Sequence, residues 1–268
     1  LSEGIKVKLN HPSDSGFGSS NLLTDLFYYL LSDNTAGVGG ILGNNDSLIN
    51  IVDLKETSKF LRTNNLFFNG AIAKPVNIRQ YITSIAPNFL CNFVLSEGKL
   101  SLIPAVPVTP NGDISTSAIT VKHLFTSGNI LEDSFELNYL GAEEREQFKA
   151  SLTWRENEKN QLPRKVVTTV RYADVSEDAD LESFDLSEYI CSEEHARMVG
   201  KYFLALRKHV THTITFKTAA FGLDLKCGDY IKVVTESSPY NAANNGVISS
   251  TGVISSARNL PDGQYKII

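Results

Sequence analysis

Hydrophobic and polar positions follow different periods in the two halves of this chain. In the first half, apolar residues recur three or four positions apart, as they do along the buried face of a helix. Two such stripes are Leu22, Leu23, Leu26, Phe27, Leu30 and Leu31, and Ile78, Tyr81, Ile82 and Ile85. Residue types that favour helix starts precede or open the periodic segments. We therefore expect helices that begin after Ser20 or Asn21, near Asp53, and at Pro75.

A short hairpin and a linker are expected after these helices. The apolar runs Phe93–Leu95 and Leu100–Ile103 flank a polar turn in which Gly98 is free to take positive φ. Residues 104–115 then carry three prolines and an Asn-Gly pair, which are turn and boundary signals. This division predicts one domain over residues 1–107 and a second over residues 108–268.

The second half alternates apolar and polar positions, which is the pattern of half-buried strands. The expected strands lie within 135–139, 148–154, 166–172, 212–217 and 230–234. One amphipathic helix interrupts them, with Ser192 as its cap and acidic and basic residues at the ends that suit its dipole. The predicted fold class is α+β: a small helical or α+β domain, followed by a mainly antiparallel β-barrel or sandwich with one amphipathic helix.

Composition narrows the function classes. Hydrophobic residues make up 42% of the 268 positions and charged residues 21%, as in ordinary globular proteins. A formal net charge of −5 argues against a general nucleic-acid-binding surface. The chain begins at Leu1 rather than Met, so we expect a processed product or a fragment. Of the three cysteines, Cys91 and Cys191 have apolar neighbours, which favours buried thiols and assembly in a reducing cytoplasm.

The glycine-rich segment 37–43 is the first candidate for chemistry. A dinucleotide fingerprint needs G-x-G-x-x-G between a strand and a helix. Here Leu42 stands where the third glycine belongs, and the segment follows a predicted helix. A connector between helices is the better interpretation.

Other titratable clusters also have structural interpretations. We expect His209 to be a cation at a helix end, His212 to face the core of a barrel, and His195 to lie on the surface of a first helical turn. Glu143, Glu144 and Glu146 are adjacent carboxylates in a polar turn rather than a pair across a cleft. The acidic run 176–182 lacks the spaced ligands and turn glycine of a calcium loop. We therefore predict no catalytic, cofactor-binding or metal-binding residues and no enzymatic activity.

An ordered series of short phrases resembles one protein family. The phrases are Thr35-Ala36-Gly37-Val38-Gly39, Phe68-Asn69-Gly70, Gly98-Lys99-Leu100, Gly128-Asn129-Ile130, Ala196-Arg197 with Gly200-Lys201, Thr213-Ile214-Thr215-Phe216 and Gly228-Asp229. In this order they resemble the central hub region of the tail-tip attachment proteins of long-tailed bacteriophages, called protein J in lambda-like phages. The resemblance covers roughly residues 20–235. Ala36 departs from it, because the family usually has an aromatic residue there, and the acidic loop 176–182 replaces a shorter connection.

The resemblance implies a structural role in a virion. Such hub subunits form a trimer that closes the tail tube, joins it to the host-attachment fibre and opens to let DNA pass. It implies a peripheral α/β hub domain over 1–107 and a β-barrel-like hub domain over 108–268. The expected partners are two further copies, other tail-tip and tail-tube proteins, and phage DNA in transit. Contact with the bacterial receptor is expected through regions outside this sequence.

Three alternatives remain open from the sequence. The first is a chance resemblance in a generic α+β domain. A second is the hub of a related contractile injection machine or gene-transfer particle. The third is a tip-associated module that binds or hydrolyses the bacterial cell wall, which needs two converging carboxylates or an aromatic platform.

Overall fold

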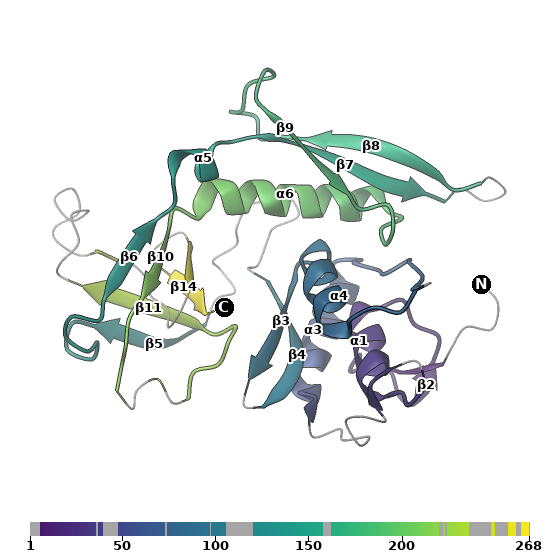
Figure 1. Ribbon diagram of the computed structural model, residues 1–268, viewed down its shortest axis with the longest axis horizontal. Helices are drawn as coiled ribbons and strands as arrows, with labels where there is room; N and C mark the ends of the chain where they lie inside the picture. The colour runs from purple at the N-terminus through teal and green to yellow at the C-terminus, as the bar shows by residue number, and fades with distance from the viewer. Residues whose placement is uncertain are drawn as a thin grey trace. The chain divides into compact units, whose positions relative to one another are not determined.

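The structure is a computed structural model of the chain, shown in Figure 1. It describes residues 6–35, 37–39, 48–72, 74–96, 98–105, 120–157, 162–219, 222, 224–235, 248–249, 257–260 and 264–267. The residues group into two compact units that alternate along the sequence. The first contains Leu1–Ala105, Ala150–Val170 and Glu182–Gly200, and the second contains Val106–Lys149, Arg171–Leu181 and Lys201–Ile268. The predicted division into domains at 1–107 and 108–268, and their assignment as hub domains, stay predictions.

The first unit contains a helical layer against a hairpin. Its elements here are β1 (Val7–Lys8), β2 (Phe17–Gly18), α1 (Leu23–Ser32), α3 (Ile51–Thr63), α4 (Ile78–Ile85), the short 3₁₀ helix η2 (Ala86–Phe89), β3 (Cys91–Ser96) and β4 (Lys99–Pro104). The two helical stripes supply the core, in which Leu23, Phe27 and Ile82 are fully buried. The Thr57 hydroxyl of α3 donates to the Leu102 carbonyl of β4 at 2.6 Å, so a buried hydrogen bond fixes the helix to the hairpin.

The predicted helix starts are wrong by a few residues. Helix α1 begins after Leu22, which has no side-chain cap. Asn50 caps α3 by accepting from the Asp53 N–H, so Asp53 lies inside the first turn. Asn77 likewise caps α4, and Pro75 precedes that helix. Asparagine is favoured at these N-cap positions because its side-chain oxygen accepts from a backbone N–H at the helix start that would otherwise be unpaired.

The hairpin was predicted correctly. Strands β3 and β4 pair antiparallel, with Ser96 opposite Lys99, and Gly98 has a φ of 74°. The predicted linker 104–115 begins at the last residue of β4, and its residues 106–115 lie outside the described part of the chain.

A three-stranded sheet continues the first unit. Its order is β8 (Arg164–Val170), β7 (Lys149–Glu156), β9 (Leu181–Asp185), and in it β7 and β8 pair antiparallel. Burial alternates along β7, with Ala150, Leu152 and Trp154 buried, as the sequence predicted. Helix α6 (Glu193–His209) begins at the predicted cap, where the Ser192 hydroxyl accepts from the His195 N–H. Gly200 of α6 packs directly on Leu152, where an added Cβ would lie 2.5 Å from Leu152 Cδ1.

The second unit contains the remaining strands. They are β5 (Val121–Thr126), β6 (Glu136–Tyr139), β10 (His212–Thr215), β11 (Tyr230–Thr235), β12 (Ile248–Ser249), β13 (Ala257–Leu260) and β14 (Gln264–Ile267), with the short helix α5 (Ala142–Arg145). Strand β11 pairs parallel with β5 and antiparallel with β12 and β14, while β10 pairs antiparallel with β6. The buried core is Phe125, Ile214, Phe216, Ile231 and Val233.

The predicted α+β class is confirmed. The described strands form several small sheets, mostly antiparallel, and none of these sheets closes into a barrel. The parallel β5–β11 pair was not expected, because the sequence signals of alternation do not reveal which distant strand lies beside which.

Candidate interaction surfaces

The segment Phe68-Asn69-Gly70 is a junction within the first unit. The Phe68 N–H donates to the Asn21 carbonyl at 2.7 Å, and the Asn69 N–H donates to the Tyr189 carbonyl at 2.9 Å. The Arg155 guanidinium also donates to the Asn69 carbonyl. The backbone N–H groups of Phe68 and Asn69 therefore connect the segment before α1 to the segment after β9.

Aromatic side chains pack around this junction. The rings of Phe68 and Tyr189 stack with centroids 5.3 Å apart, and Tyr81 meets Tyr189 edge-on at 6.0 Å. An added Cβ on Gly70 would lie 2.6 Å from Tyr189 Cδ1 and 2.9 Å from the Glu188 carbonyl oxygen. Glycine is required here because the chain passes too close to both groups for any side chain. Burial, with a smaller contribution from Tyr189, raises the pKa of Tyr81.

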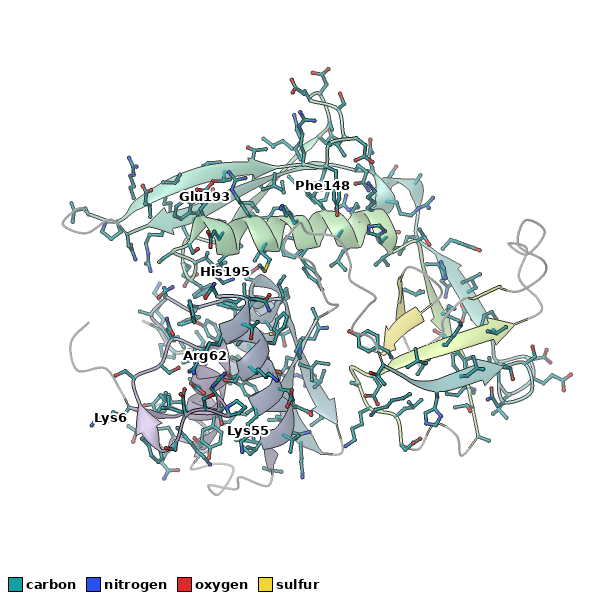
Figure 2. The ribbon with its side chains drawn as sticks, turned by 180° about the vertical axis from the view of Figure 1, so that it is seen from behind. Lys6, Lys55, Arg62, Phe148, Glu193 and His195 are labelled. Atoms are coloured by element: carbon teal, nitrogen blue, oxygen red, sulfur yellow. The ribbon has the colours of Figure 1, made fainter. Side chains whose placement is uncertain are left out.

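His195 belongs to the core and not to the surface, so its predicted position is wrong. The side chain is only 2% exposed, and its Nε2 lies 2.9 Å from the Asn88 carbonyl oxygen. The ring meets Phe89 edge-on at 5.1 Å (Figure 2 labels the residue). Burial lowers the pKa of His195 to about 4, although the hydrogen bond to Asn88 opposes this shift. The ring is therefore neutral near pH 7, with Nε2 as the donor. No local pattern in the chain reveals this burial, because the contact joins residues 107 positions apart.

The described part of the glycine-rich segment packs on the C-terminal end of α1. The N–H groups of Val38 and Gly39 donate to the carbonyls of Leu30 and Asp33, each at 3.0 Å. An added Cβ on Gly37 would lie 2.3 Å from the Leu30 carbonyl oxygen. This is the negative end of a helix, and these N–H groups are already used, so the geometry is opposite to that of a phosphate loop. Residues 40–43 of the segment lie outside the described residues.

An apolar groove of about 480 Å³ lies between α1, α4 and the hairpin. It is lined by Phe27, Leu31, Val38, Val76, Asn77, Ile78, Arg79, Ile82, Phe93, Leu95 and Leu100. Two of these apolar side chains are well exposed: Leu95 at 61% and Val76 at 41%. Exposed, contiguous apolar surface of this kind is typical of protein–protein contacts.

The other predicted residues occupy structural positions. His209 is the last residue of α6, and His212 lies half-buried in β10, where burial lowers its pKa. The Glu144 carboxylate accepts from the Gly141 N–H at 2.8 Å. In the acidic loop, Glu177 pairs with Arg171 at 2.8 Å.

No cluster of three or more His, Cys, Asp or Glu side chains suited to a metal ion occurs among the described residues. Within the same ranges, no helix is both long and apolar enough to cross a membrane. Cys91 is buried as predicted, whereas Cys191 is only half-buried and accepts hydrogen bonds from Arg155.

Comparison with solved structures gives a distant likeness, whereas no protein-family model and no curated protein match the chain. Among solved structures, it is similar to a chain of the virion of a native gene transfer agent (GTA) particle, at 14% sequence identity and a TM-score of 0.38. The alignment covers 58% of this chain and 34% of that one, so the match spans about a third of the virion chain. A likeness of this degree establishes neither a common fold nor a function.

Proposed function

We propose that the protein is a structural component of a phage-like virion, and more specifically a hub subunit of a tail tip. In this role it closes the tail tube and connects it to the host-attachment fibre, without catalysis. The support is the ordered series of phrases shared with tail-tip attachment proteins. It acts in the virion after assembly in the host cytoplasm.

One observation carries the proposal: most glycines of these phrases lie where the fold depends on them, with Gly128 as the exception. Gly70 passes against Tyr189 and the Glu188 backbone, Gly98 has positive φ in the hairpin turn, and Gly200 packs on Leu152. Phrases that occurred by chance would fall at tolerant surface positions as often as at such constrained ones.

The proposed partners are two further copies of the chain, neighbouring tail-tip and tail-tube proteins, and DNA in transit. We place a contact with a second copy at the apolar groove. Its exposed side chains, Leu95 and Val76, gain most from removal from water, because apolar burial is the main favourable term in association.

Electron microscopy of the concentrated protein tests this function. Class averages of negatively stained particles are expected to show rings with threefold symmetry. Particles without threefold symmetry would contradict the hub assignment. A cell-wall turnover assay on the same preparation addresses the hydrolase alternative. Turnover that disappears when one carboxylate is replaced would overturn a non-catalytic role.

A further inference from the structure

The acidic loop 176–182 is held in place by hydrogen bonds on both of its sides. The Arg171 guanidinium donates to the Glu177 carboxylate at 2.8 Å, and the Lys149 ammonium donates to the Glu177 carbonyl. The Lys149 N–H donates to the Asp180 carbonyl at 2.8 Å, just before β9 begins. Because its backbone is fixed in this way, the loop loses little conformational freedom when it binds another molecule.

This loop combines negative charge with an exposed apolar side chain. Leu181 is 57% exposed, and the nearby Asp178 and Asp180 are exposed as well. Neither carboxylate forms an ion pair or a hydrogen bond with the side chain of any described residue. The loop therefore presents an acidic surface around a leucine.

The apolar groove between α1, α4 and the β3–β4 hairpin has the complementary character. Its lining contains a single charged residue, Arg79, which is exposed and forms no ion pair or hydrogen bond within the described part of the chain. Leu95 and Val76 supply exposed apolar surface in the same lining. The groove is therefore suited to an apolar side chain that has a negative charge beside it.

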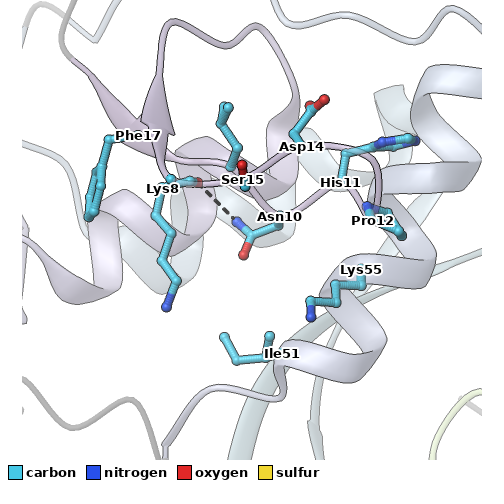
Figure 3. Close-up of a pocket in the computed structure, with 11 residues that line it drawn as sticks. Lys8, Asn10, His11, Pro12, Asp14, Ser15, Phe17, Ile51 and Lys55 are labelled. Atoms are coloured by element: carbon cyan, nitrogen blue, oxygen red, sulfur yellow. Dashed lines mark hydrogen bonds between the residues drawn. The ribbon is translucent and has the colours of Figure 1, made fainter.

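The polar pocket beside the loop that joins β1 to β2 is a poorer contact surface (Figure 3). It has a volume of about 320 Å³, and its polar side chains include Asn10 and Asp14. The Asn10 amide donates to Asp25 at 2.9 Å, and Asp14 pairs with Arg62. Because these groups already have partners within the chain, their burial against another molecule would gain little.

A ring of three copies requires a contact between two different surfaces. Under threefold symmetry, each copy meets the next head to tail, so one patch binds another patch elsewhere on the neighbouring copy. A groove that forms the contact in the proposed ring therefore needs an apolar partner on a different part of the chain.

Two exposed leucines in the described residues have acidic residues as immediate neighbours in the sequence. One is Leu181, and the other is Leu131, which precedes Glu132. Leu131 is less exposed, at 48%, and its N–H donates to the carbonyl of Lys217, which places a basic residue next to it. Leu181 is therefore the better match to a groove with a positive charge, and Leu131 is a suitable control.

We propose that the acidic loop 176–182 of one copy docks in the apolar groove of the next copy. Leu181 packs against Leu95 in the groove, and the carboxylates of the loop pair with Arg79. This contact rests on the proposed hub function, because it is a head-to-tail contact within the ring of three copies.

Single substitutions test the two sides of this contact by sedimentation velocity. Leu181→Ser is expected to raise the dissociation constant for self-association about tenfold or more, because a leucine is no longer buried. Leu131→Ser, which changes an equally acidic and exposed site, is expected to leave it unchanged. Equal shifts for the two variants would overturn the proposal, as would an unchanged constant for Leu181→Ser.

Reversal of charge tests whether the loop meets Arg79. Arg79→Glu and Asp180→Lys are each expected to weaken self-association about tenfold, because like charges then face each other. The two changes in one chain restore an attractive pair, so the double variant is expected to associate about threefold more tightly than either single variant. Effects that simply add would overturn the pairing.

A mixture of two variants tests whether the contact is head to tail. Leu95→Ser alters the groove and keeps the loop, whereas Leu181→Ser alters the loop and keeps the groove. An equal mixture retains one unaltered contact, so it is expected to form complexes of two chains at concentrations where each variant alone is a single chain. A contact of groove with groove would give no such complex.

The results separate the docking of the loop from the hub function. A mixture that stays at single chains, while the native protein forms trimers, would overturn the docking and leave the hub function standing. A native protein that stays at one chain at every concentration would overturn both.

Discussion

Gly200 and Leu152 are in contact, so closely that a Cβ on residue 200 would lie 2.5 Å from Leu152 Cδ1. The contact joins α6 to the buried face of β7 within the first unit. Gly200→Ala gains helix propensity, about 1 kcal/mol, but forces the buried Leu152 side chain to move. We expect a net destabilisation of about 1 kcal/mol in urea unfolding.

A second substitution reverses the sign of this effect. In a Leu152→Ala background the obstructing atoms are gone, so Gly200→Ala is expected to stabilise the protein by about 1 kcal/mol. A destabilisation of the same size in both backgrounds would show that the two residues are not coupled.

Gly70→Ala tests the junction around Tyr189. The new Cβ meets the Glu188 backbone as well as the Tyr189 ring, and backbone cannot move aside as a side-chain end can. We expect a loss of about 1–3 kcal/mol in the free energy of unfolding. Gly128→Ala is the matched control, since the nearest atom to its added Cβ is the Thr126 Oγ1, at 3.7 Å. Similar losses in both variants would contradict the close approach at Gly70.

His195 makes stability depend on pH. Its folded pKa of about 4 lies below the unfolded value of 6.5, so the folded protein prefers the neutral ring. Its contribution is complete above pH 6.5 and decreases as the pH falls toward 4, because only the unfolded chain takes up the proton in that interval. The slope is up to about 1.4 kcal/mol per pH unit.

His195→Gln retains a donor for the Asn88 carbonyl but does not titrate. Urea midpoints measured from pH 7 to pH 4.5 are expected to fall more steeply for the native sequence than for this variant. Parallel profiles would mean that His195 takes up its proton equally in both states.

Leu95 tests the apolar groove as a contact between copies. Leu95→Ser removes a side chain that is 61% exposed and lines the groove, whereas Val52→Ser changes one that is 70% exposed elsewhere on the same unit. Burial of a leucine contributes about 1.5–3 kcal/mol, so the first variant is expected to raise the dissociation constant at least tenfold. Sedimentation velocity measures this shift. An unchanged constant for Leu95→Ser, or an equal shift for Val52→Ser, would exclude the groove.

The sequence predicted those features that depend on local pattern. The alternation through Leu152 and Trp154 predicted strand β7. Ser192 predicted the start of α6, and Gly98 predicted the hairpin turn. Period and turn chemistry are properties of neighbouring residues, so a single chain reveals them.

Features that depend on distant partners were not predicted. The burial of His195 requires Asn88 and Phe89, and the pairing of β5 with β11 joins strands about a hundred positions apart.

The mass of the protein in solution tests the hub assignment most directly. Light scattering behind size exclusion, over a range of loading concentrations, measures it on the isolated chain. The account predicts a mass that rises with concentration toward three times the 29.5 kDa of the single chain. A mass that stays at one chain throughout the range, or that stops at two, would contradict the proposed trimer.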